Sequence, residues 1–216
     1  MPMILGHRGY SAEYLENSMQ AFRAALEAGM DGFELDVQPT RDGVCVVMHD
    51  EELGRTAQAP GILREMKAGQ LPLLLNGEPI PRLAEVLALP ARLTNVELKG
   101  RSVWQLALEI VQAESALHRV LFSSFEHAAI FQLHTACPWA RCGLLWTNDE
   151  ASQVTENQID KLPVDFTLHL PIGAIQARPE FWMTYGERIV LWDLMSARQA
   201  QAVTFTPAVI VADSPV

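Results

Sequence analysis

The chain has 216 residues, of which 49% are hydrophobic and 19% charged, and its formal net charge is −10 at pH 7. This length suits one sizeable core, so we expect a single domain over residues 1–216. The acidic balance argues against binding to nucleic acid or to an anionic membrane surface, because both require a basic footprint. The three cysteines form neither an even set nor a close pair. With neither a signal-like leader nor a long apolar run, the sequence fits a cytoplasmic protein without stable membrane anchoring.

Short apolar runs recur along the chain, and most lack polar alternation, which is typical of strands buried on both faces of a parallel sheet. In chain order these strand candidates span 3–6, 32–37, 94–98, 119–123, 142–146, 165–170, 188–192 and 208–212. Helix-like stretches lie between them. The first is expected to begin at Asn17, an N-terminal cap with Gln20 three residues later, and to stop at Gly29. Ser102 with Gln105 repeats this pattern. Further helices are expected over 82–89, 125–135, 150–161, 176–185 and 196–202.

Two segments after the second strand interrupt this alternation. Asp42 and Gly43 mark a tight turn, so we expect residues 44–48 to return as a hairpin arm that brings His49 to the site. Residues 51–80 follow with many glycines and prolines and few periodic apolar positions. We interpret them as a small insertion rather than a second domain.

Eight strand candidates alternating with helices indicate an α/β protein, either a closed TIM (β/α)₈ barrel or a large doubly wound sheet. A dinucleotide-binding sheet would need a G-x-G-x-x-G turn after the first strand, and Gly6-His7-Arg8-Gly9 lacks that spacing. Charged groups at the carboxyl ends of several strands favour the barrel, where enzymes of this fold assemble their sites. We therefore predict a TIM barrel, with residues 51–80 as a small insertion over its mouth.

Ionisable side chains lie inside or directly after four of the apolar runs. Side chains two apart on a strand share a face, so Glu34 and Asp36 project together, as do Glu97 and Lys99. Three converging carboxylates would repel one another unless a cation lay between them, and an all-oxygen ligand set favours Mg²⁺ or Ca²⁺, with Mn²⁺ as an alternative. His7, after the first strand, is left free for proton transfer. His49 is the second such imidazole, at the end of the hairpin arm.

Each of these residues also has a purely structural interpretation. The two carboxylates of the second strand could form a solvated face. Glu97 and Lys99 could form an exposed salt bridge of little energetic value. Arg8 could lie on a helix surface. His169 could line a pocket or satisfy a hydrogen bond in the core, and Trp192 could wall a pocket or belong to the core.

A set of motifs resembles the glycerophosphodiester phosphodiesterase family from end to end of the chain. In chain order the motifs are His7-Arg8-Gly9, Glu16-Asn17-Ser18, Glu34-Leu35-Asp36-Val37, Thr40 with Asp42-Gly43, Val46-Val47 with His49-Asp50, Ile80-Pro81 before Leu83-Glu85-Val86-Leu87, Glu97-Leu98-Lys99 and Ser124-Phe125. The resemblance implies a TIM barrel with a small insertion after the second strand.

The same resemblance implies roles for individual residues. A divalent metal would be held by Glu34, Asp36 and Glu97. His7 and His49 would act as acid and base. Arg8 and Lys99 would contact the phosphate. We add Phe125, His169 and Trp192 as candidate substrate-binding residues.

The chain departs from the family pattern at several positions. Leu15 replaces a proline, and Ala57 replaces a threonine, both away from the expected chemistry. The family's Trp-Thr-x-Asn appears as 192–195, with Asp193 in place of threonine, which alters one wall of the pocket. Asp213 lies in the final motif, 212–215, after which no eighth helix is expected. A partner subunit, in a homo-oligomer, would then cover the barrel edge.

The expected reaction is metal-dependent hydrolysis of a small-molecule glycerophosphodiester to sn-glycerol 3-phosphate and an alcohol. Either water or the neighbouring glycerol hydroxyl could be the nucleophile, and either histidine could be the base. Two alternatives stay open. One is a phospholipase D-like lyase acting on lysophospholipids, and the other is a non-catalytic barrel that binds glycerophosphodiesters, since fold alone does not fix function.

Overall fold

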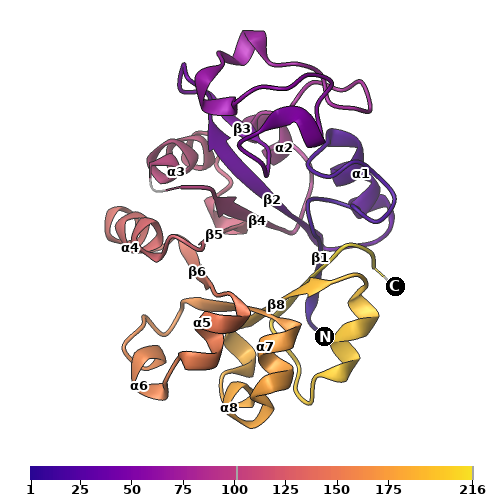
Figure 1. The fold of residues 1–216 in the computed structure, drawn as a ribbon. Helices are drawn as coiled ribbons and strands as arrows, with labels where there is room; N and C mark the ends of the chain where they lie inside the picture. Colours follow the sequence, from indigo (N-terminus) through magenta and orange to yellow (C-terminus); the bar gives the residue numbers. More distant parts are fainter. Residues whose placement is uncertain (101, 216) are drawn as a thin grey trace.

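The protein, a computed structural model described at residues 1–100 and 102–215, is built around a closed barrel of parallel strands (Figure 1). Among the described residues the barrel strands are β1 (Met3–Gly6), β2 (Gly32–Pro39), β4 (Leu93–Leu98), β5 (Val120–Ser124), β6 (Arg141–Leu145), β7 (Thr167–Pro171), β8 (Ile189–Leu194) and β9 (Val209–Ala212). β1 pairs in parallel with both β2 and β9, which closes the sheet. The predicted TIM barrel is confirmed, and each predicted strand is present: the first has the predicted bounds, and the others have shifted ends.

The hairpin arm after β2 is also present. β3 (Cys45–Val47) runs antiparallel to β2, with Val37 opposite Val47. Residues 51–80 then form three short 3₁₀ helices, η1 (Leu53–Arg55), η2 (Leu63–Glu65) and η3 (Ala68–Gln70). An apolar cluster that includes Leu53 of η1, Leu63 of η2 and Leu74 packs this segment against Val46 of β3. In Figure 1 this segment lies beside β3 and α2 (Leu83–Leu87), at one side of the barrel.

The remaining helices lie outside the barrel (Figure 1). They are α1 (Met19–Glu27), α3 (Val103–Ala113), α4 (His127–Ala136), α5 (Asn148–Gln153), α6 (Glu156–Ile159), α7 (Ile172–Ala177) and α8 (Pro179–Met183), with 3₁₀ helices η4 (Leu117–Arg119), η5 (Gly186–Arg188) and η6 (Ala197–Ala202). Their apolar faces pack on the outer side of the sheet. Of the described helices, none is long and apolar enough to cross a membrane. Cys45, Cys137 and Cys142 are buried free thiols.

Three predicted helices differ from the observed ones. The stretch 150–161 is divided into α5 and α6, because Val154 is extended and Thr155 starts a new capping box. The stretch 176–185 is also divided, because Arg178 precedes a proline and leaves the helical region (φ −142°, ψ 57°). The stretch 196–202 forms the 3₁₀ helix η6 rather than an α-helix. After β9, residues 213–215, the last that the structure describes, form no helix.

The interior of the barrel is apolar at the amino ends of its strands. Leu5, Leu93, Leu121, Val190 and Val209 form a buried cluster there. This packing fills the amino-terminal half of the barrel. Open space inside the barrel therefore lies toward the carboxyl ends, where the predicted site residues are located.

Candidate active site

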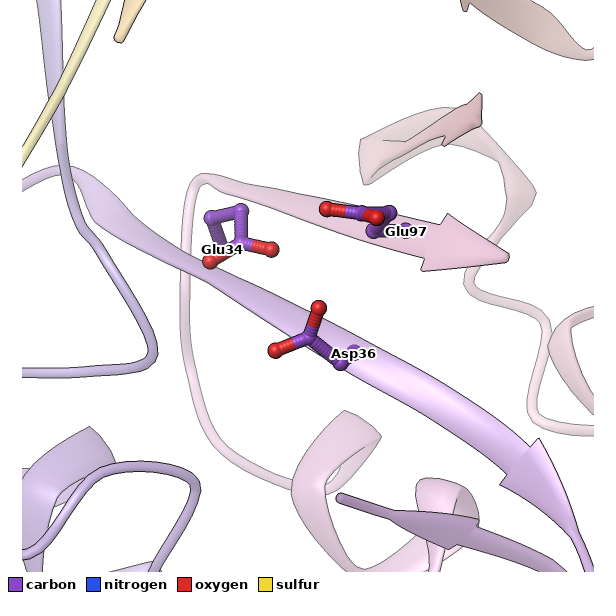
Figure 2. A group of neighbouring side chains, drawn as sticks. All are labelled: Glu34, Asp36 and Glu97. Atoms are coloured by element: carbon purple, nitrogen blue, oxygen red, sulfur yellow. The ribbon is translucent and has the colours of Figure 1, made fainter. Parts of the chain in front are cut away.

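Three carboxylates gather on two adjacent strands of the barrel. Glu34 and Asp36 lie two residues apart on β2, and Glu97 is the register partner of Asp36 on β4. One carboxylate oxygen from each residue lies within 4.8 Å of the others. Figure 2 shows the three side chains on these two strands. The period-2 spacing and the parallel register thus bring together the three residues predicted as metal ligands.

The three carboxylates are too close together to be ionised independently. Burial raises the pKa of Glu34 to about 8, and the charge of Asp36 adds to this effect. The same two causes raise the pKa of Glu97 to about 7. Burial alone would also raise the pKa of Asp36, but the positive charges of Lys99 and Arg8 hold it below its ordinary value. The cluster thus lacks the positive charge that would let all three carboxylates ionise at neutral pH.

Two cationic side chains partly compensate the negative charge of the carboxylates. Lys99 Nζ lies 2.5 Å from Glu97 Oε1 and 3.1 Å from Asp36 Oδ1, and Arg8 Nε lies 3.4 Å from Asp36 Oδ2. Within the described part of the chain, the buried Asp36 Oδ1 makes no well-oriented hydrogen bond. A hard divalent cation fits this donor set, because it takes carboxylate oxygens and supplies the missing positive charge.

The loop from β1 to α1 holds the cluster from one side, and sequence reasoning missed the part played by Asn17. Asn17 Nδ2 donates to Asp36 Oδ2 at 2.9 Å, from a left-handed backbone (φ 54°) that asparagine tolerates well. The predicted N-cap role of Asn17 is wrong, since Ser18 Oγ accepts from Ala21 N and caps α1. The departure of Asn17 from helical geometry aims its side chain at the barrel instead.

Arg8 lies in the same loop and has a similar left-handed backbone (φ 55°). Its N–H donates to Glu34 Oε2 at 3.0 Å, so the main chain and the guanidinium both contact the acidic cluster. Gly9 follows with φ 87°, and a Cβ there would lie 2.6 Å from the backbone carbon of Ala21. Only glycine fits at this point, where the loop crosses α1.

Each of the two predicted acid–base histidines is held by a carboxylate. His7 Nδ1 lies 2.8 Å from Asp213 Oδ1, which also accepts from Ser11 Oγ at 3.1 Å. His49 Nδ1 lies 2.7 Å from Asp50 Oδ1. An ionised carboxylate only accepts, so each Nδ1 donates its proton, and Nε2 is the nitrogen left for other partners. Burial lowers the pKa of His7, but the Asp213 hydrogen bond and the Glu34 charge outweigh it and raise the pKa overall.

Arg55, which lies in the insertion, contacts two carboxylates of the site, one beside His49 and one beside Arg8. Arg55 Nε pairs with Asp50 Oδ2, while its terminal nitrogens contact Glu16 at 2.6 and 2.7 Å. Glu16 also accepts from Arg8 at 2.7 Å. The Arg55 hydrogen bond is the main cause that lowers the pKa of Asp50 to about 2. Arg55 therefore ties the carboxylate that orients His49 to the one that orients Arg8.

Arg55→Gln is expected to lower kcat about ten-fold, because Asp50 and Glu16 lose the group that fixes their positions. Steady-state kinetics with thermal unfolding measures this effect, and the midpoint should change little because Arg55 is half-exposed. Arg64→Gln is the matched control, since Arg64 forms an exposed ion pair with Glu51 in the same insertion. Equal kcat values for the two variants would contradict the positioning role of Arg55.

The site residues surround one cavity of about 260 Å³ at the carboxyl ends of the strands. Its lining residues are His7, Arg8, Glu34, His49, Asn95, Glu97, Lys99, Phe125, Leu145, His169, Trp192 and Val211. Every predicted site residue except Asp36 therefore lines the cavity, and Asp36 is buried behind it. One side of the cavity is ionic and the other is apolar.

The apolar side contains the three further predicted residues. Phe125 and Trp192 meet edge to face with ring centroids 5.9 Å apart. His169 is fully buried, and burial lowers its pKa to about 3, so the ring is neutral at pH 7. Trp192 lies at a bulge between Leu191 and Leu194 of β8, where Asp193 has φ 66° and faces solvent. Asp193, where the family pattern has threonine, thus places a charge outside the cavity wall that Trp192 forms.

Ionisable side chains at the carboxyl ends of the strands of a closed (β/α)₈ barrel give this protein the layout of a barrel enzyme. The model of the glycerophosphoryl diester phosphodiesterase family matches residues 7–169. The chain therefore belongs to this family of enzymes, as its motifs predicted.

Individual relatives agree with this assignment. The chain is 37% identical over 163 residues to a glycerophosphodiester phosphodiesterase of Bacillus altitudinis, and the aligned region covers 67% of this chain and 66% of that relative. The chain thus spans just under two thirds of the length of the curated relatives it matches.

Two solved structures have the same fold. The glycerophosphodiester phosphodiesterase of Thermotoga maritima is 29% identical with a TM-score of 0.81, covering 99% of this chain and 95% of that one. A phosphodiesterase of Oleispira antarctica, solved in complex with the product sn-glycerol 3-phosphate, is 21% identical with a TM-score of 0.80, covering 99% of this chain and 93% of that one.

Proposed function

We propose that this protein hydrolyses glycerophosphodiesters, such as glycerophosphocholine or glycerophosphoethanolamine, to sn-glycerol 3-phosphate and an alcohol. The observation that carries the proposal is a single cavity lined by an acidic cluster and by two histidines, each oriented by a carboxylate. Membership of the family supports the reaction class. The product bound by the Oleispira antarctica relative supports the substrate class.

Glu34, Asp36 and Glu97 are proposed to hold a divalent metal, with Mg²⁺, Ca²⁺ and Mn²⁺ as candidates. A bound metal of this kind would stabilise negative charge on the phosphoryl oxygens. Arg8 and Lys99 reach the cavity from either side of Asp36, so they both balance the carboxylates and attract an anionic phosphodiester. The overall negative charge of the chain makes this local positive potential important for binding.

His7 and His49 are proposed to move the protons. In each ring the hydrogen bond at Nδ1 fixes the tautomer, so Nε2 is the atom that exchanges a proton with the substrate. One imidazole accepts the proton of the nucleophile, and the other donates a proton to the leaving alkoxide. The positions of the two rings are compatible with either histidine as the base. They are also compatible with either water or the neighbouring glycerol hydroxyl as the nucleophile.

The apolar wall at Phe125 and Trp192 is proposed to contact the alcohol part of the substrate, which leaves through the open end of the barrel. Phe125 is 40% exposed, so the head group at that end stays partly in solvent. A cytoplasmic location and a homo-oligomer also stay predictions.

A release assay tests the proposed function. The purified protein is incubated with a panel of glycerophosphodiesters and with Mg²⁺, Ca²⁺ or Mn²⁺, and free sn-glycerol 3-phosphate is measured. Release that depends on a divalent metal is the expected result. A cyclic phosphate formed from lysophospholipid would instead identify the lyase. Calorimetric binding of a glycerophosphodiester without any product would identify a non-catalytic binding barrel.

A further inference from the structure

A polar layer lies inside the barrel, at the level of Glu34, the carboxylate of the cluster that lies nearest the amino ends of the strands. Asn95 precedes Glu97 by two residues on β4, so both side chains face the barrel interior, and Asn95 is nearer the amino end of the strand. Asn95 is 2% exposed and lines the cavity. In the described part of the chain its Oδ1 has no hydrogen-bond partner. A buried amide without a partner is costly, so its position at the cavity wall points to a bound group.

Ser123 adds a second polar atom to this layer. It lies on β5 between Leu121, which belongs to the apolar cluster inside the barrel, and Phe125, which lines the cavity. By the same alternation the Ser123 side chain faces inward. It is completely buried, and its Oγ lacks a hydrogen-bond partner among the described residues. Its register partner on β4 is Glu97, so it lies at the level of the carboxylates or just below them.

His169, on β7, adds a third polar group to this layer. Its Nε2 lies 2.9 Å from Thr167 Oγ1 and occupies the space above Gly143, where a Cβ would come within 2.2 Å of that atom. The ring edge that carries Nδ1 is therefore turned away from Gly143. The ring is neutral at pH 7 because burial lowers its pKa to about 3. His169 lines the same cavity as Asn95.

Asn95, Ser123 and His169, which we call the polar floor, are neutral, unlike the ionic side of the cavity. Asn95 and His169 line the cavity, whereas Ser123 is completely buried and is not among the lining residues. Arg8 and Lys99 are both engaged with the carboxylates above it. A site of neutral hydrogen-bonding groups compensates a phosphate or an ammonium ion poorly, because burying a charge without a charged partner is costly. The polar floor instead suits a small neutral hydroxyl group, which can both donate to and accept from such atoms.

We propose that the polar floor binds the terminal hydroxymethyl group of the glyceryl half of the substrate. This proposal rests on the proposed function. The depth of the floor decides which end of the substrate it meets, because the head group lies toward the open end near Phe125 and the phosphate lies between the cations and the imidazoles. An ordered water would satisfy the same atoms, so the test separates a substrate hydroxyl from water.

The test compares two substrates that differ only at this hydroxymethyl group. One is glycerophosphocholine, and the other is its analogue with a 2-hydroxyethyl group in place of glyceryl, which keeps the hydroxyl next to the phosphate ester. Asn95→Leu removes the hydrogen-bonding amide at nearly constant volume. We expect this variant to lose about ten-fold in kcat/KM on glycerophosphocholine and much less on the analogue, because one neutral hydrogen bond to substrate contributes about this factor.

Thr94→Val is the matched control. Thr94 is the preceding residue on β4 and is also completely buried, and its Oγ1 lacks a hydrogen-bond partner among the described residues. Its side chain faces the outer side of the sheet, away from the cavity. We expect it to match the wild-type protein on both substrates. Ser123→Ala is the second floor variant, with the same selective loss expected, and it serves if Asn95→Leu does not fold.

The outcomes distinguish a failure of the polar-floor assignment from a failure of the proposed function. An equal loss on both substrates, or no loss on either, overturns the assignment of the polar floor and leaves it a water site or a packing feature. A wild-type protein that releases no product from any glycerophosphodiester overturns the proposed function itself. A selective loss on glycerophosphocholine supports the assignment.

Discussion

His49→Ala is expected to lower kcat by about 100- to 10,000-fold, the usual contribution of one general acid or base. His7→Ala should have an effect of the same size. Both histidines lie in loops at the carboxyl ends of strands and are only partly buried, so the thermal midpoint should change little. Measurements of kcat, together with thermal unfolding of the same preparations, check this prediction.

His118→Ala is the control for this pair of variants. His118 is exposed, and its Nδ1 bonds only locally, to Ser115 O, at the helix that precedes β5. Its removal should leave kcat unchanged. Full activity in either the His7→Ala or the His49→Ala protein would exclude proton transfer by that ring.

The metal-free protein is expected to lose stability as the pH rises from about 5 to 8.5. Glu34 and Glu97 have folded-state pKa values of about 8 and about 7, above the ordinary value of 4.5 that applies when the chain is unfolded. Between these values the folded protein holds more protons than the unfolded chain, so the free energy of unfolding falls with pH. The expected loss is on the order of a few kcal/mol. Carboxyls with lowered pKa values, such as Asp50, have already ionised in this range and do not oppose the effect. His169, whose pKa burial lowers to about 3, opposes the effect below about pH 6.5, where the unfolded chain still binds a proton at this ring, but the two glutamates outweigh it.

A divalent cation should reverse this loss, because it binds the ionised carboxylates of the folded protein. Thermal unfolding in chelator and in Mg²⁺, Ca²⁺ or Mn²⁺, at pH 5.5 and pH 8.5, measures both effects. Glu34→Gln should flatten the pH dependence in chelator and weaken the response to metal, while Glu51→Gln on the surface should change neither. If the stability of the metal-free protein is constant or rises over this pH range, the two glutamates do not have the raised pKa values described above.

The barrel strands could be predicted because each one is a buried apolar run with its own boundaries. Helix ends were less predictable, since they depend on single residues whose backbone is set by their neighbours. At Arg178 the following proline excludes the helical region, and at Val154 a new cap begins at the next residue. Both interruptions had a signal in the sequence, namely Pro179 and the Thr155-to-Gln158 capping box, which the apolar periodicity alone did not reveal.

Within the site, the spacing of residues along the strands predicted the metal ligands. It did not predict which residues hydrogen-bond to the site residues. Glu34 and Asp36 share a face because strand side chains alternate, which holds for any strand. Asp213 lies 206 positions from the histidine that it orients, so no local pattern links them. Asn17 resembled a helix cap, and only its left-handed backbone directs it to Asp36.

The sequence by itself determined the alternation of strands and helices, the family and the ionisable groups at the strand ends, because these follow from local periodicity and from motifs of adjacent residues. Only the tertiary structure decided which charges compensate one another and that Arg55 connects Asp50 to Glu16. It also decided that Asn95 and Ser123, which have polar atoms without partners among the described residues, lie beside the carboxylates. These features depend on closure of the barrel, which brings β1 against β9 and sets the register between strands far apart in the chain. Hydrogen bonds and charge interactions act over a few ångströms in space, whatever the separation in sequence.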